Sequence, residues 1–237
     1  MGLKTKGKMP DKEIYDEHAD QYEQLVSYED WEGNLAPALS RIRPLDGLDV
    51  IELGAGTGRL TCLIAPQVKS ILALDASAPM LQVAKAKLER GGWRHCRVAV
   101  ADHRRLPFAD ASADLILAGW TIAQMVAWNL DTWQTQVESV LAEMRRVLRP
   151  GGTIVIIETL GTGHATPYRP EKLAPYYLLL EARGFSSTWI RTDFRFESVT
   201  QAESLIGFFF GTELEHQLVQ EHGTTVPECT GLWWMNV

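Results

Sequence analysis

The sequence has few cysteines, no excess of positive charge and no long apolar run. Its three cysteines, Cys62, Cys96 and Cys229, are an odd number at wide spacings, which excludes a disulfide framework and a Cys-x-x-Cys metal site. Lys and Arg number 23 against 30 Asp and Glu, a net charge of −7, which disfavours a general binder of nucleic-acid phosphates. No apolar stretch approaches the roughly 20 residues that a membrane helix needs. We therefore expect no metal, nucleic-acid or membrane partner.

The N-terminal segment also lacks a secretory signal. Residues 1–8 include basic side chains, but no apolar stretch follows them, as a signal peptide would require. The sparse, scattered cysteines fit a reducing compartment. We therefore expect a cytoplasmic protein.

Alternating strand and helix patterns fill most of the chain. Hydrophobic residues make up 46% and charged residues 22% of the sequence, as in globular domains. Strands are predicted at 48–53, 71–74, 97–101, 113–119 and 153–158, with helices at 11–26, 31–42, 59–65, 80–90 and 133–148, the last capped by Asp131. A helix at 170–183, a strand at 187–196, a helix at 200–210 and a strand at 231–237 follow. Such alternation predicts an α/β, doubly wound, mostly parallel sheet with helices on both faces.

The most informative motif is the glycine-rich turn Gly54-Ala55-Gly56-Thr57-Gly58, which joins the first strand to a helix. Glycines there allow a tight turn and a close approach of the backbone to a ligand, although they can also serve the turn alone. A dinucleotide fingerprint would need a third glycine at position 59, where Arg59 stands, so a nicotinamide dehydrogenase is disfavoured.

Two acidic residues follow the next strands and would lie at the same edge of the sheet. Asp75 closes the second strand and could accept hydrogen bonds from ribose hydroxyls; the plainer interpretation is a helix N-cap. Asp102 closes the third strand and could accept from an adenine amino group, or could be an ordinary solvated loop acid.

These residues belong to a longer stretch, about residues 48–160, that resembles a known family. The segments 50–58 (VIELGAGTG), 74–81 (LDASAPML), 102–108 (DHRRLPF), 113–117 (ADLIL) and 148–152 (LRPGG) resemble the successive motifs of class I S-adenosylmethionine-dependent methyltransferases. The family implies a seven-stranded Rossmann-like sheet whose last strand runs antiparallel, with S-adenosyl-L-methionine as cofactor and S-adenosyl-L-homocysteine as product. It also implies one domain over 1–237, with a helical cap (1–45), a cofactor-binding core (46–160) and a substrate-side half (161–237).

The resemblance implies a set of cofactor contacts. Asp75 would bind the ribose, Asp102 the adenine amino group, and the glycine turn would lie beneath the methionine part. Met80 would pack near the adenine, and the 118–120 segment would lie under the transferred methyl. The expected cofactor-binding residues are Glu52, Gly54, Ala55, Gly56, Thr57, Arg59, Asp75, Ala76, Met80, Asp102, His103, Gly119, Trp120, Tyr15 and Tyr22.

The substrate is expected to be a small, partly apolar or aromatic molecule. The Asn/Asp-Pro-Pro-aromatic motif of nucleic-acid amino methylases is missing after the fourth strand, and no Pro-Cys pair exists for attack on cytosine. Eight tryptophans exceed what core filling requires, and some would serve as pocket walls. The expected substrate contacts are Trp31, Trp120, Gln124, Trp128 and His164.

No catalytic base follows from the sequence. Methyl transfer draws its reactivity from the cofactor, so a neutral amine needs little base catalysis, whereas a hydroxyl usually needs it. His164, His103 and Tyr22 are weak candidates, with His18 a further histidine to consider; most single histidines are surface or structural residues. A non-catalytic cofactor-binding subunit stays open as an alternative, with Phe208-Phe209-Phe210 either as its interface or as core. We expect a monomer or a homodimer.

Overall fold

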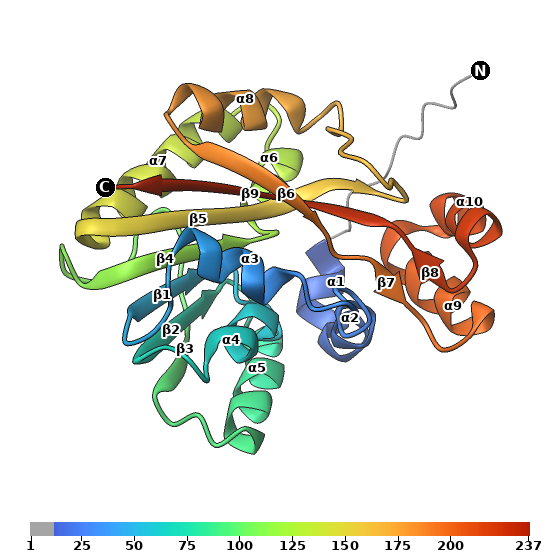
Figure 1. The fold of residues 1–237 in the computed structure, drawn as a ribbon, viewed down its shortest axis with the longest axis horizontal. Coiled ribbons are helices and arrows are strands. Elements are labelled where there is room, and N and C mark those ends of the chain that lie inside the picture. Colours follow the sequence, from blue (N-terminus) through green and yellow to red (C-terminus); the bar gives the residue numbers. More distant parts are fainter. Residues whose placement is uncertain (1–11) are drawn as a thin grey trace.

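The fold is known from a computed structural model that describes residues 12–237 (Figure 1). The helices are α1 (Lys12–Glu17), α2 (Ala19–Val26), α3 (Leu35–Ile42), α4 (Arg59–Ile64), α5 (Ala78–Arg90), α6 (Ile122–Trp128), α7 (Trp133–Val147), α8 (Ala174–Ala182), α9 (Val199–Phe210) and α10 (Thr212–His222). The strands are β1 (Asp49–Leu53), β2 (Ser70–Asp75), β3 (Cys96–Val100), β4 (Ala113–Gly119), β5 (Leu148–Thr162), β6 (Ser186–Arg191), β7 (Phe194–Arg195), β8 (Thr225–Val226) and β9 (Glu228–Asn236). The expectation for residues 1–8 lies outside the described residues.

Seven strands form one sheet in the order β3-β2-β1-β4-β5-β9-β6. Neighbouring strands are parallel from β3 to β5, while β9 is antiparallel to both β5 and β6. The predicted doubly wound, mostly parallel, seven-stranded sheet with an antiparallel last strand is confirmed.

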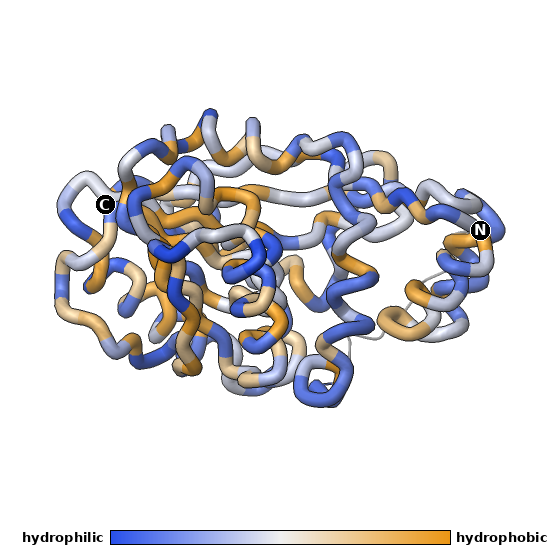
Figure 2. The backbone as a smooth tube through the Cα atoms, turned by 90° about the horizontal axis from the view of Figure 1, so that it is seen from below, coloured by the Kyte–Doolittle hydropathy of each residue, from blue (hydrophilic) through white to orange (hydrophobic). Residues whose placement is uncertain are grey.

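Helices cover both faces of this sheet. Helices α3, α4 and α5 lie on one face and α6, α7 and α8 on the other (Figure 1). Side chains alternate between the faces along each strand: in β4, Ile116 and Ala118 join the core under α7, whereas Leu115 and Leu117 join the core under α4 and α5. Because both faces of the central strands are buried, the residues of β1, β4 and the middle of β5 are mostly apolar, as the hydrophobic colouring in the middle of Figure 2 shows.

A smaller lobe packs against the N-terminal helices. Helices α9 and α10 and the two-stranded β7–β8 sheet share a core to which Leu25 of α2 contributes. Segments from the two ends of the chain therefore lie side by side at one end of the sheet (Figure 1). Within residues 12–237, no helix is both long and apolar enough to cross a membrane.

Several predicted element bounds were wrong. The helix expected over 11–26 is two helices, because the backbone at His18 leaves the helical conformation with φ −127° and ψ 36°. Thr132, rather than Asp131, precedes α7. The strand expected at 187–196 is split, since β6 ends at Arg191 and the next strand pairs in the separate small sheet.

Two helices lacked a sequence signal strong enough to predict them. Helix α6 is only seven residues long and follows β4 directly, and α10 is mostly polar. Short helices depend on tertiary contacts for most of their stability. Both were missed because their own residues carry little signal, and the supporting contacts come from the neighbouring helices α7 and α9.

A buried carboxyl on β5 holds the first turn of α6. Glu158 is fully buried, and its Oε1 accepts a hydrogen bond from the Ala123 backbone N–H at 2.9 Å and from the Tyr176 hydroxyl at 3.4 Å. Burial raises the pKa of Glu158 from 4.5 to about 8, although these hydrogen bonds oppose the shift. The carboxyl is therefore mostly neutral at pH 7.

The raised pKa predicts a pH-dependent loss of stability. Because the folded chain holds this proton more tightly than the unfolded chain, the Glu158 contribution is full below pH 4.5 and is lost as the pH rises through about 8. Urea denaturation should show Glu158→Gln gaining at least about 1 kcal/mol relative to the unmodified chain between pH 5 and pH 9. The exposed Glu171→Gln is the control. A constant difference between E158Q and the unmodified chain would contradict the assignment.

Candidate functional site

A cavity of about 1100 Å³ opens at the carboxyl ends of β1, β2 and β4. Its walls come from the turns after these strands and after β3, from helices α1, α2 and α6, and from Gln136 and Lys172. Open α/β sheets bind ligands at this edge. The volume exceeds that of most single-ligand pockets, which are roughly 300–1,000 Å³, so two small molecules can lie there together.

Glycine is favoured at each of the three positions of the turn, and the structural reason differs from one position to the next. All have positive φ, +70° at Gly54, +53° at Gly56 and +79° at Gly58, a region that L side chains disfavour. A Cβ at Gly54 would come within 2.3 Å of the Thr121 side chain, and one at Gly58 would come within 3.0 Å of the Ala84 Cβ. At Gly56, a Cβ would meet only Tyr22 Cε1, at 3.9 Å. The missing side chain at Gly56 therefore leaves a hollow in the cavity wall, here called the Gly56 cradle, which any Cβ would partly fill.

Asp75 ties this turn to the end of β2. One carboxylate oxygen accepts the Gly56 N–H and the other accepts the Ser77 N–H, both at 2.8 Å. The cap of α5 is Ser77, whose Oγ accepts from the Met80 N–H, so the interpretation of Asp75 as the N-cap was wrong. Asp75 still lines the cavity, and each oxygen has a further lone pair for a ligand hydroxyl.

Asp102 and His103 flank the cavity after β3. Arg104 binds both oxygens of Asp102, and this hydrogen bonding lowers the pKa of Asp102 to about 2. His103 Nε2 accepts the Gly54 N–H at 3.1 Å, and burial lowers the pKa of the imidazole. The His103 side chain is therefore a neutral support for the glycine turn rather than a free catalytic base.

Aromatic side chains from the N-terminal helices cover the cavity. The ring centroid of Tyr15 lies 5.5 Å from that of Tyr22 and 5.9 Å from that of Trp128. Phe209 of α9 packs against both tyrosines, so part of the Phe208-Phe209-Phe210 run supports this cover. Gln124 Nε2 donates to the Tyr15 hydroxyl at 2.7 Å. Burial raises the pKa of both tyrosines, so neither hydroxyl is a ready base.

Trp120 forms the wall between the glycine turn and α6 in an uncommon backbone conformation. Its φ is +49°, and its N–H donates to the Ile157 carbonyl at 2.7 Å. The Arg59 guanidinium stacks 4.5 Å from the ring centroid and forms an ion pair with Glu29 at 2.5 Å. Arg59 therefore lies behind Trp120, where it fixes the ring in place.

The cavity brings together many of the residues predicted from the sequence. The predicted residues that line it are Tyr15, Tyr22, Gly54, Gly56, Asp75, Ala76, Asp102, His103, Gly119, Trp120, Gln124 and Trp128. The predicted residues that do not line it are Trp31, Glu52, Ala55, Thr57, Arg59, Met80 and His164.

The residues left out have their own packing partners. Glu52 accepts the Thr61 hydroxyl at 2.6 Å inside the core, and burial raises the pKa of its carboxyl to about 7. Met80 is also in the core, on the face of α5 that turns towards the sheet. Ala55 and Thr57 are buried within the turn itself.

Trp31 and His164 lie elsewhere. The Arg195 guanidinium stacks on Trp31 at 4.5 Å. His164 stacks on Tyr168, with 4.5 Å between centroids. His164 was misplaced because β5 continues to Thr162, four residues past its predicted end, which at about 3.3 Å per residue moves the following loop by roughly 13 Å.

The sequence missed cavity residues that depend on tertiary structure. Lys12 and Asp16 belong to α1, and Gln136 and Lys172 come from α7 and the segment before α8. None stands in a motif, so no local signal could have identified them. Arg104 and Thr121, by contrast, follow strand ends and could have been predicted from that position alone.

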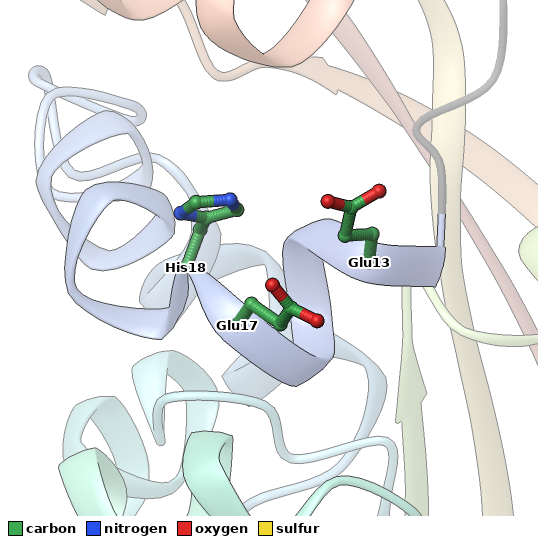
Figure 3. Close-up of side chains that lie close together, drawn as sticks. All are labelled: Glu13, Glu17 and His18. Atoms are coloured by element: carbon green, nitrogen blue, oxygen red, sulfur yellow. The ribbon is translucent and has the colours of Figure 1, made fainter.

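Glu13, Glu17 and His18 form a second cluster, on α1 and its junction with α2 (Figure 3). One potential ligand atom from each lies within 4.8 Å of the others. Both glutamates are exposed, and the His18 ring packs edge-on against Phe208. None of the three lines the cavity, so His18 is not placed to act there.

Comparisons with known proteins agree with this architecture. A family model described as "Methyltransferase domain" matches residues 51–156. The demethylmenaquinone methyltransferase of Lactococcus lactis subsp. lactis is 30% identical over 154 residues, which are 62% of this chain and 58% of that protein. The arsenite methyltransferase of Aquipseudomonas alcaligenes is 30% identical over 205 residues, 82% of this chain and 48% of that protein.

A solved structure extends the similarity beyond the matched segment. A SAM-dependent methyltransferase from Aquifex aeolicus superposes with a TM-score of 0.60 at 17% identity, covering 92% of this chain and 98% of that one. This likeness concerns the fold, whereas the curated relatives supply the sequence relationship over about half of their length or slightly more. The matched domain, these relatives and the sheet order together support a class I S-adenosylmethionine-dependent methyltransferase.

Proposed function

We propose that the chain binds S-adenosylmethionine in the cavity and transfers its methyl group to a small, partly apolar or aromatic molecule. The observation that carries this proposal is that one cavity contains the Gly56 cradle, the Asp75 carboxylate and a set of aromatic walls. These walls, the aromatic chamber, are Tyr15, Tyr22, Trp120 and Trp128. The cradle suits a ligand that approaches the backbone closely, and the carboxylate suits vicinal hydroxyls. The methyltransferases named above are relatives of this chain, which supports the same class of reaction here.

The bound cofactor would supply an electrophilic methyl group on a sulfonium. Asp75 would accept hydrogen bonds from the ribose hydroxyls, and Asp102 from the adenine amino group. Tyr15 and Tyr22 would exclude water, because they cover the cavity and are largely buried themselves. Trp120, fixed by Arg59, would align the acceptor for an in-line displacement.

The acceptor must arrive as a nucleophile or lose its proton to a group not yet identified. His103 accepts a backbone hydrogen bond, and the buried tyrosines hold their protons. This arrangement favours an amine, thiolate or acidic carbon or hydroxyl group over an ordinary alcohol.

A non-catalytic cofactor-binding subunit is the weaker alternative, because the relatives are named as enzymes. A cytoplasmic location, a monomeric or homodimeric state, and the division into cap, core and substrate-side half stay predictions.

Asp75→Asn tests the ribose assignment. Loss of the carboxylate charge should weaken binding of S-adenosylhomocysteine by about 1.5–3 kcal/mol, the range for a hydrogen bond to a charged group. Calorimetry measures the affinity, and thermal unfolding controls for the two backbone hydrogen bonds of Asp75. The exposed Asp131→Asn, outside the cavity, is the matched control. Unchanged affinity in D75N would reject the assignment, as would tight binding of NAD in place of either sulfur nucleoside.

Gly56→Ala tests the cradle against Gly47→Ala. Both glycines have positive φ, +53° and +71°, and a Cβ has space at both positions. Each alanine should therefore cost about 1–2 kcal/mol of stability, measured by urea denaturation. Only G56A should also weaken S-adenosylhomocysteine binding, by at least about tenfold, since Gly47 lies outside the cavity. Equal affinities in the two variants would place the cofactor elsewhere.

A further inference from the structure

Two lysines in the cavity wall differ from the other lysines that the structure describes. Lys69, Lys85 and Lys87 each form an ion pair with a carboxylate. No ion pair joins Lys12 or Lys172 to any residue within 12–237, and both line the cavity. In a chain with a net charge of −7, carboxylates are available to neutralise lysines. Among the described residues, these two ammonium groups thus have no carboxylate partner, and both line the same cavity.

The two lysines reach the cavity from separate parts of the chain. Lys12 is three residues before Tyr15 on α1 and so shares its helix face. Tyr15 in turn contacts Trp128 edge-on and accepts a hydrogen bond from Gln124. Lys172 lines the same cavity from the segment just before α8. Lys12 therefore shares a helix face with a residue that contacts α6, and Lys172 adjoins α8.

Two of the acidic groups of the cavity have partners of their own. Asp75 accepts two backbone N–H groups, and Asp102 is bound by Arg104. Asp16 stands one helical turn after Lys12, and within residues 12–237 no ion pair joins the two side chains. Lys12 and Lys172 are thus cavity-lining cations that no carboxylate within residues 12–237 neutralises, and they can attract a negative charge.

The pair formed by Tyr15 and Gln124 adds a polar anchor beside the lysines. Because Gln124 Nε2 donates to the Tyr15 oxygen, the Tyr15 hydroxyl keeps its proton and the Gln124 Oε1 keeps its lone pairs for a ligand. Together with Trp128 and Met125 on the wall, the site offers an apolar surface, a polar pair and two cations.

From this juxtaposition we infer that the methyl acceptor is an anionic amphiphile, an aromatic or apolar body that bears a carboxylate, sulfonate or phosphate group held by Lys12 and Lys172. The inference rests on the proposed function and narrows its substrate class. The apolar body would lie against Trp128, and the acidic group would face the mouth of the cavity. A lysine ammonium is a compact charge on a flexible side chain, so the two lysines could hold any of these acidic groups.

Two fluorescent probes that differ by one charged group test the inference. 1-Anilinonaphthalene-8-sulfonate is anionic, and N-phenyl-1-naphthylamine has the same rings without the sulfonate. Binding of each is measured with saturating S-adenosylhomocysteine and repeated without it. The variants are Lys12→Gln/Lys172→Gln and, as a control with the same change of charge, Lys69→Gln/Lys85→Gln. Trp128→Ala, which should weaken both probes, verifies the location.

In the K12Q/K172Q variant, the sulfonate probe should bind about fivefold to tenfold more weakly and lose most of its salt dependence. The neutral probe should change less than about twofold, and the K69Q/K85Q control should leave both probes unaffected. Equal losses in the two double variants, or no loss in either, would overturn the inference.

Calorimetry of the same samples separates this inference from the proposed function. If S-adenosylhomocysteine binds but the sulfonate probe does not discriminate between the variants, only the anionic substrate class is wrong. If the nucleoside does not bind, the proposed function fails, and the inference about a methyl acceptor fails with it. If the sulfonate probe still binds more weakly to K12Q/K172Q than to the unmodified chain in that case, the cavity binds anions but serves another function.

Discussion

The ion pair between Arg59 and Glu29 is the interaction on which the shape of the site depends. Arg59 is the first residue of α4, directly after the glycine turn, and Glu29 follows α2 of the N-terminal cap. The pair is largely removed from water, so loss of either partner would leave a charge without its counterion. Its guanidinium also stacks on Trp120. One contact therefore joins the cap, the glycine turn and the cavity wall.

The same contact extends to the C-terminal half of the chain. The Thr192 hydroxyl donates to Glu29 at 3.2 Å and contacts the Thr230 hydroxyl on β9 at 2.6 Å. The Asp30 N–H donates to the Thr192 carbonyl, and Leu25 of α2 packs in the core of the C-terminal lobe. The cover of the cavity is thus built from both ends of the chain. This construction explains how residues far apart in sequence, such as Tyr22 and Phe209, meet over the glycine turn.

The core of the fold was predictable because its signals are local. Buried parallel strands are continuous apolar runs, and functional side chains stand at their carboxyl ends, so Asp75 and Asp102 could be placed without a structure. Errors began where a side chain's direction or a distant contact decided the outcome. Glu52 was placed one strand position from the turn, yet its side chain enters the core to meet Thr61. Lys172 carries no motif and reaches the cavity only because α8 packs beside α6 and α7.

A crystal structure of the chain with S-adenosylhomocysteine tests the central claim most directly. We expect the ribose at the Asp75 carboxylate, the adenine beside Asp102 and the sulfur in front of Trp120, with Lys12 and Lys172 left available to an acceptor. A nucleoside bound outside this cavity, or bound with its sulfur turned away from Trp120, would contradict the assignment of this cavity as the site of methyl transfer.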